Sequence, residues 1–225
     1  MSVTPVAQVI AAVAAFVGTH LLMSHPSRAP LVARLGQRGF LGLYTLVSFV
    51  TLGWVVWAML TVGPEPFLWT APQWAWWFAG AVMLVASILL VGSLIGNPAL
   101  PGMRPQDREP RGVFAVTRHP MMWSFALWAF AHALVWPQPS VLVLAAGMAL
   151  LALAGAAGQD AKKSKLQPDF WPAWRAKTAF VPFSGPSPSR AWWPGWGVML
   201  GGLVLWLVAT RLHPLLGTPA VGVWG

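Results

Sequence analysis

Long apolar segments alternate with polar segments along the whole chain. Six of the apolar segments approach or exceed the length needed to cross a bilayer, since a membrane-spanning helix takes about 20 apolar residues. They cover residues 6–23, 40–62, 74–95, from about 113 or 117 to 135, 140–157 and 192–210. No internal repeat and no linker divides them. The pattern predicts an all-α fold, a polytopic transmembrane helical bundle of about six spans, formed by a single domain over residues 1–225.

The connections between these segments refine the prediction. Residues 136–139 form a short, proline-containing connection between the fourth and fifth segments. A turn of this kind places two helices side by side and antiparallel. Residues 159–190 form the one long polar segment of the sequence. We therefore expect tight packing of the fourth and fifth spans, and a longer loop before the sixth.

Composition agrees with a membrane protein. Of the 225 residues, 57% are hydrophobic and only 8% are charged, whereas soluble domains carry about 25% charged residues. The 16 tryptophans suit a chain whose surroundings are membrane lipids, because indole rings favour the membrane–water interface. The absence of cysteine excludes disulfides, thiolate metal sites and iron–sulfur clusters.

The basic residues indicate an orientation. The formal net charge is +9, and 13 of the 14 Lys and Arg residues fall in alternate connections between the spans. They are Arg28, Arg34, Arg38, Arg104, Arg108, Arg111, Arg118, Lys162, Lys163, Lys165, Arg175, Lys177 and Arg190, with Arg211 as the exception. By the positive-inside rule, those connections face the cytoplasm and both termini lie on the non-cytoplasmic side. We thus interpret the charge as a topology signal, and expect no nucleic-acid partner.

Candidate chemistry gathers around residues 112–132. Arg118 and His119 precede Pro120, and His132 follows thirteen residues after His119 in an aromatic, apolar segment. Ionisable residues in such a segment indicate function by default. All five acidic residues lie in expected loops, which argues against a carboxylate pair or a carboxylate proton relay. The chain has no phosphate-binding glycine loop and no zinc-protease motif.

Histidines in an apolar bundle suit haem b, which needs imidazole ligands, apolar walls and cations for its propionates. His20 of the first span and His132 of the fourth are candidate axial ligands, and Arg118 could neutralise a propionate. His119 lies roughly 20 Å from His132 along a straight helix, at a depth closer to that of His20. The pairs His20–His132 and His20–His119 both stay open. His213 lies beyond the last expected span and receives no role.

Two blocks of residues resemble a known family. The first extends from His20 through residues 24–28 to Tyr44, and the second from residues 117–120 to His132. Together they resemble the NnrU family, from His20 to residue 182. Membership implies a bacterial inner-membrane protein associated with denitrification and nitric oxide or nitrite metabolism.

The same blocks are similar to plant and cyanobacterial zeta-carotene isomerases, which are membrane proteins that use haem b. That resemblance implies haem ligation by His20 and His132, with His119 as the further histidine of the second block. The isomerases carry a cysteine close to the second ligand, whereas this chain has none.

A second resemblance points to another class. The Arg118-His119-Pro120 stretch, with residues 171–183, resembles isoprenylcysteine and phospholipid methyltransferases. In those enzymes the corresponding segments enclose S-adenosylmethionine at the cytoplasmic face. Their paired acidic residues correspond here to Asp160 alone. The resemblance implies a shared fold more than a shared reaction.

Three functions follow as hypotheses. The first is an NnrU-like inner-membrane protein that binds haem b, acting in nitrogen-oxide metabolism or in haem-dependent isomerase or redox chemistry. The second is an S-adenosylmethionine-dependent methyltransferase of a lipid or small thiol, with Arg118 and His119 holding the carboxylate of the cofactor. The third is an accessory membrane protein without a cofactor. The substrate would be small or hydrophobic.

Overall fold

The computed structural model describes residues 5–100 and 109–216, and throughout these residues the regular structure is helical. The long helices are α1 (Pro5–Ser24), α2 (Arg28–Thr61), α3 (Gln73–Ser93), α5 (Pro120–Val135), α6 (Pro139–Leu166) and α8 (Trp196–Leu212). Shorter elements are α4 (Val113–Val116), α7 (Trp171–Lys177), η1 (Ser189–Ala191) and η2 (His213–Leu216). The basic residues Arg104 and Arg108 and the chain beyond residue 216 lie outside the described residues.

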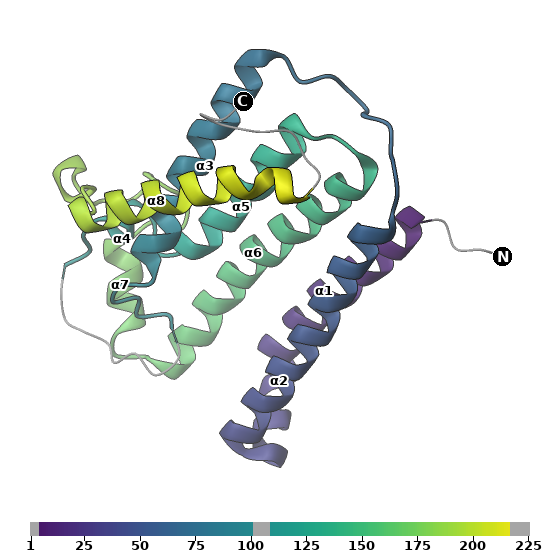
Figure 1. Cartoon of the computed structure of the whole chain (residues 1–225). Coiled ribbons are helices and arrows are strands. Elements are labelled where there is room, and N and C mark those ends of the chain that lie inside the picture. The colour runs from purple at the N-terminus through teal and green to yellow at the C-terminus, as the bar shows by residue number, and fades with distance from the viewer. Residues whose placement is uncertain (1–4, 101–108, 217–225) are drawn as a thin grey trace.

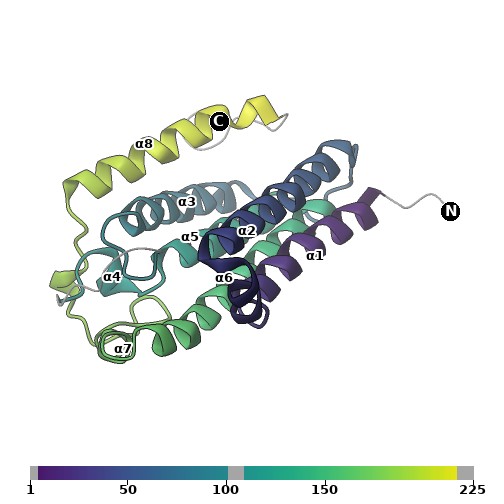
Figure 2. The ribbon, with the colours of Figure 1, turned by 90° about the horizontal axis from the view of Figure 1, so that it is seen from below.

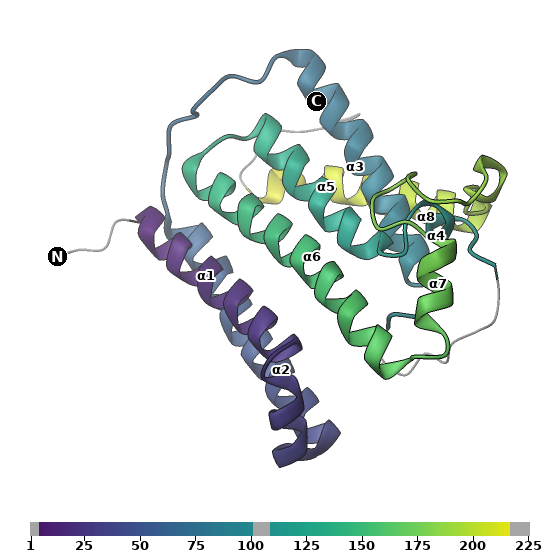
Figure 3. The same cartoon turned by 180° about the vertical axis from the view of Figure 1, so that it is seen from behind.

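The long helices form a row in which each packs on its neighbours. The order is α2, α1, α6, α5, α3, α8, with α6 lying between α1 and α5 (Figures 1 and 3). Figure 2 shows α8 alongside α3, on the side away from α6. α1 and α6 approach closely at Gly147, where a Cβ atom would clash with Val13. This arrangement separates the α1–α2 hairpin from the half of the bundle that contains α3, α5 and α8.

The predicted membrane class is confirmed. Within residues 5–100 and 109–216, five helices are long and apolar enough to cross a membrane, and α5 is a shorter apolar helix. With 16 residues, α5 is roughly 24 Å long, so it spans less than the approximately 30 Å thickness of a hydrocarbon core. The chain is thus a polytopic helical membrane protein with about six spans. The antiparallel packing of α5 on α6 agrees with the predicted turn at residues 136–139.

Several helix ends differ from the predicted boundaries, and α8 begins at Trp196 rather than residue 192. α2 begins at Arg28 rather than residue 40, with a kink at Gly36, whose φ of 69° suits glycine. α6 continues past residue 157 to Leu166, so the polar segment predicted as a loop begins as helix. The fourth span begins at Pro120, because proline disfavours helical geometry at the preceding His119 and suits the first helical position.

The two ends of the bundle differ in charge. Chain direction places the start of α2, the end of α6, α4, α7 and η1 at one end (Figure 1). Among the described residues, every Lys and Arg except Arg211 belongs to that end, which we call the basic end. The opposite end holds the α5–α6 turn and the end of α8. Candidate site residues lie at both ends, and α5 connects them.

Candidate functional site

His132 lies in the last turn of α5, at the end opposite the basic end. Its Nδ1 is 2.8 Å from the backbone oxygen of Trp128, and its ring stacks on the Trp128 indole at 4.2 Å between centroids. A carbonyl oxygen only accepts hydrogen bonds, so Nδ1 carries the ring proton and donates it. Nε2 therefore keeps its lone pair, as a metal-ligating imidazole requires.

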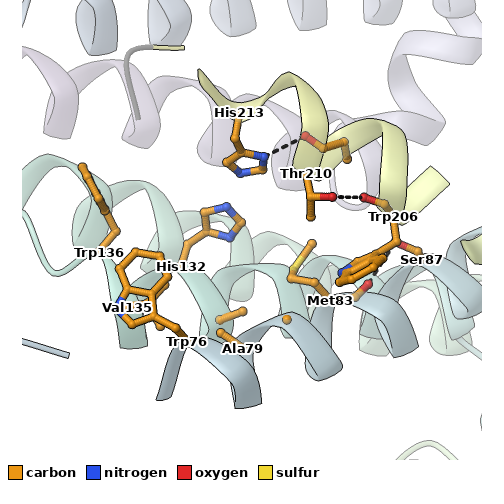
Figure 4. A pocket seen from close by; sticks show the side chains of 13 residues that line it. Trp76, Ala79, Met83, Ser87, His132, Val135, Trp136, Trp206, Thr210 and His213 are labelled. Carbon is orange, nitrogen blue, oxygen red and sulfur yellow. Dashed lines mark hydrogen bonds between the residues drawn. The ribbon is translucent and has the colours of Figure 1, made fainter. Parts of the chain in front are cut away.

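His132 faces an apolar cavity of about 100 Å³ between α3, α5 and α8 (Figure 4). Its lining is dominated by aromatic and small apolar groups, with few polar atoms. The lining residues include Trp76, Ala79, Met83, Ser87, Val135, Trp136, Trp206, Thr210 and His213. Both α5 and α8 pack on α3. The cavity is the space between α5 and α8 that their side chains do not fill.

His213 faces His132 across this cavity (Figure 4). It begins η2, which continues α8, and its Nδ1 is 2.8 Å from the backbone oxygen of Ala209. The same argument as for His132 assigns the ring proton to Nδ1 and a lone pair to Nε2. The apolar segment of α8 extends through Leu215, so His213 lies within the last span rather than beyond it.

The spacing of the two rings suits an axial pair. Their centroids are 6.1 Å apart and their planes differ by 22°. Two imidazoles that ligate one iron from opposite sides have ring centres roughly 6 Å apart, since each metal–nitrogen bond is about 2 Å. Among the described residues, no group of three or more His, Cys, Asp or Glu could hold a metal ion. A pair of histidines suits a haem, which takes only two protein ligands, better than a tetrahedral site.

His20, the other predicted ligand, lies in a different part of the bundle. Its Nδ1 is 2.8 Å from the Phe16 backbone oxygen, and its Nε2 is 3.2 Å from Ser48 Oγ of α2. The Tyr44 ring packs edge-on against it. His20 is thus a contact within the α1–α2 hairpin, and α6 lies between α1 and α5. The structure does not bring His20 and His132 together.

Arg118 and His119 form a buried cluster with Asp160 at the basic end. The Arg118 guanidinium donates to both carboxylate oxygens of Asp160, at 2.6–3.0 Å, and to the Thr178 backbone oxygen at 3.2 Å. The Arg118 and Asp160 side chains are only 8% and 9% exposed. The guanidinium also lies over the Phe180 ring, 5.4 Å from its centroid. These contacts occupy Arg118 with groups of the protein itself.

His119 belongs to the same cluster. Its Nε2 is 2.9 Å from Asp160 Oδ1, its side chain is 0% exposed, and the Trp171 indole N–H also donates to this oxygen. The cluster joins the start of α5, the end of α6 and the start of α7. Neither His119 nor Arg118 is near His132, because they precede α5 and His132 lies in its last turn.

Sequence reasoning missed Asp160 as the partner of Arg118, and His213 as the partner of His132. Asp160 is 42 residues from Arg118 in sequence, and its position was predicted as loop. A signal was available, since a buried arginine needs a carboxylate and Asp160 is the acid nearest to an expected span on the side of Arg118. For His213, the signal is that the fourth and sixth spans run in the same direction and both end in a histidine.

A comparison with family models identifies one match. The model described as "NnrU protein" matches residues 8–220, which include all the long helices except the first few residues of α1. No curated protein and no solved structure matches the chain.

Proposed function

The chain belongs to the NnrU family, and on that premise we propose that it binds one haem b through His132 of α5 and His213 of η2. The observation that carries the proposal is the pair of imidazole rings, 6.1 Å apart, facing each other across an apolar cavity. Each ring has its Nδ1 proton held by a backbone oxygen. These bonds hold the orientation of both rings, so that each could ligate iron through Nε2.

The walls of the cavity would suit a porphyrin face, but its volume of about 100 Å³ is below the roughly 300–1,000 Å³ of ligand pockets, so haem binding would require α5 and α8 to move apart. Trp76, Trp136 and Trp206 supply flat apolar surface, and Met83 adds a polarisable side chain. The cavity opens between α5 and α8, two helices that each pack on α3. Arg118, which the sequence suggested as a propionate partner, lies at the opposite end of α5 from this cavity.

The chemistry of the site follows from its ligands and walls. A haem iron supplies one-electron redox chemistry, or a coordination position if one axial ligand leaves. His132 is held by α5 and by its stack on Trp128, so it is the fixed ligand. His213, in a short 3-10 helix, would be the second ligand. The apolar lining excludes water and favours a small, uncharged ligand.

This chemistry supports a role in nitrogen-oxide metabolism in the bacterial inner membrane, with the basic end facing the cytoplasm. Nitric oxide is a small uncharged molecule that partitions into apolar surroundings and binds iron. Electron transfer through a six-coordinate haem is the related redox alternative. Carotenoid isomerisation has less support, because the cysteine of the isomerases is absent.

The methyltransferase hypothesis has less support as well. The Arg118 guanidinium is bonded to Asp160 and Thr178, and the His119 side chain is fully buried against Asp160. A cofactor carboxylate would have to displace Asp160 from both residues. A hollow of about 330 Å³ is lined by Arg118 and Arg175, but the guanidinium of Arg118 is already bonded to groups of the protein.

The test is the visible absorption spectrum of the chain purified in mild detergent after expression with adequate haem supply. We expect a Soret band and sharp reduced α and β bands, at about one haem per chain. His132→Ala should abolish the spectrum, and the matched control His20→Ala should leave it unchanged. A folded, haem-free wild-type protein would contradict haem binding and favour a cofactor-free role. Loss of haem in His20→Ala alone would favour the ligand set implied by the isomerases.

A further inference from the structure

Two hollows lie next to each other at the basic end and share Glu109 and Arg111. The first has a volume of about 580 Å³ and lies between residues 109–111, the end of α7 and the segment around η1. The second, of about 440 Å³, is lined by Ile95, Phe114 and Trp174 in addition to the shared pair. Lys177 and Arg190 line only the first hollow, whereas Phe114 and Trp174 line only the second, and this combination suggests an amphipathic ligand.

The first hollow is positively charged. Arg111, Lys177 and Arg190 line it from three separate segments, together with one carboxylate, Glu109. Lys177 Nζ is 2.7 Å from Glu109 Oε1, in an exposed ion pair. Among the described residues that line this hollow, two guanidinium groups therefore remain in excess over acidic groups. Guanidinium groups bind phosphate oxygens in bidentate geometry.

Backbone contacts hold the walls of this hollow in place. The Gly112 amide donates to the Ala191 backbone oxygen at 2.7 Å, which joins the segment of Arg111 to that of Arg190. Ser187 Oγ donates to the Lys177 backbone oxygen at 3.2 Å. Gly112 has a φ of 59°, and a Cβ atom there would lie 2.9 Å from the Pro194 Cα. The segments that carry the cations are thus fixed relative to one another.

The second hollow is mainly apolar. Ile95 and Phe114 form its walls with the indole of Trp174, a residue only 5% exposed. The Trp174 N–H has no hydrogen-bond acceptor within the described part of the chain. Buried donors are normally satisfied, so an oxygen of a bound molecule is a suitable acceptor.

We propose that the two hollows bind one anionic phospholipid, its phosphate in the cationic hollow and its glycerol and first acyl carbons in the apolar one. Basic pockets at the cytoplasmic side of membrane proteins suit such headgroups. The exposed indoles of Trp193 and Trp196 follow Arg190 closely, and exposed tryptophans are typical of the membrane interface. The apolar hollow distinguishes a lipid from free phosphate, which would use the cationic hollow alone.

The experiment measures thermal unfolding of the full chain in neutral detergent. The probes are dioleoyl phosphatidylglycerol, dioleoyl phosphatidylcholine and inorganic phosphate, each added over a concentration series. We expect only phosphatidylglycerol to raise the midpoint in a saturable way. In Arg111→Gln/Arg190→Gln, its apparent affinity should fall roughly tenfold to a hundredfold.

Matched variants separate this site from general attraction to anions. Arg34→Gln/Arg38→Gln removes two exposed arginines elsewhere at the basic end and should keep the wild-type affinity. Trp174→Phe keeps an aromatic ring but removes the N–H, and should weaken binding. If the double variant Arg111→Gln/Arg190→Gln does not fold, Arg190→Gln alone serves, because its side chain is exposed on η1.

Two results would overturn the proposal. An equal shift with inorganic phosphate would identify a site for free phosphate compounds and not for a lipid. An equal loss of phosphatidylglycerol affinity in Arg34→Gln/Arg38→Gln would show that surface charge, not the two hollows, attracts the lipid.

Discussion

α5 connects two histidines whose surroundings are opposite. His119, just before the helix, bonds a carboxylate that is also bonded to Arg118 and Trp171. His132, in its last turn, bonds only a backbone oxygen through Nδ1 and faces an apolar cavity. The first histidine has a charged partner inside the protein, whereas the second keeps a lone pair directed at a space that a ligand can occupy.

The surroundings of the two histidines indicate a structural role for His119 and a ligand-binding role for His132. Their positions in the sequence do not indicate these roles as clearly. Arg118 makes a bidentate contact with the buried carboxylate of Asp160, and the His119 imidazole bonds the same carboxylate. This cluster connects three helix ends. A pair of imidazoles with Nδ1 bonded to backbone oxygens and no carboxylate between them is the arrangement on which the proposed haem ligation rests. Substitutions at the Asp160 end should change stability, and those at the His132 end should change haem binding.

The largest effect is expected from Asp160→Ala. It leaves the Arg118 charge buried without its partner, and breaking a buried pair costs about 3–5 kcal/mol. The variant should unfold at a clearly lower temperature in detergent or fail to accumulate in the membrane. The double variant Arg118→Met/Asp160→Leu should recover much of the loss, because apolar groups can replace a buried ion pair. No recovery would indicate that the cluster does more than brace the fold.

His132→Ala should remove haem while the helical fold is retained. The His132 ring stacks on Trp128 and otherwise lines the cavity. Its removal should therefore cost little packing but should eliminate a proposed haem ligand. Haem content per chain and far-ultraviolet circular dichroism measure the two properties separately. An unchanged haem content would contradict the assignment of His132.

His213→Ala should have a smaller effect on haem content and a specific effect on coordination. The iron keeps His132 and loses its sixth ligand, so the spectrum should change from low-spin to high-spin, with a broad reduced α region. Added imidazole, which can occupy the vacated position, should restore the low-spin spectrum. A low-spin spectrum that persists without imidazole would assign the sixth ligand to another residue.

The smallest effect is expected from Glu109→Ala, which serves as the contrast to Asp160→Ala. The Lys177–Glu109 pair has a distance of 2.7 Å, like the buried pair, but its side chains are 46% and 68% exposed. Exposed ion pairs contribute only about 0–1 kcal/mol because water screens them. The unfolding temperature should change little. A loss as large as that of Asp160→Ala would contradict the argument from burial.

Much of the fold was predictable, because apolar length determines which segments can span a membrane. The tight connection at residues 136–139 also predicted the α5–α6 pair correctly. Helix ends were less predictable. Polarity predicts a loop for the lysines at the end of α6, but they lie in its last helical turn. Cations at a helix C-terminus interact favourably with the helix dipole, so basic residues there do not end the helix.

The candidate site was predictable only in part. Arg118, His119 and His132 were identified because ionisable groups in apolar segments need partners. Their partners, Asp160 and His213, come from α6 and η2, and only the packing of the helices brings them together. The pairing of His20 with His132 stays a prediction from resemblance, and the structure places Ser48 beside His20 instead.

The most direct test of the account is electron paramagnetic resonance of the ferric protein, comparing wild type with His213→Ala and His20→Ala. Ligation by His132 and His213 predicts a low-spin signal in wild type and in His20→Ala, and a high-spin signal in His213→Ala. A low-spin signal that survives in His213→Ala and disappears in His20→Ala would contradict the account and identify His20 as a haem ligand.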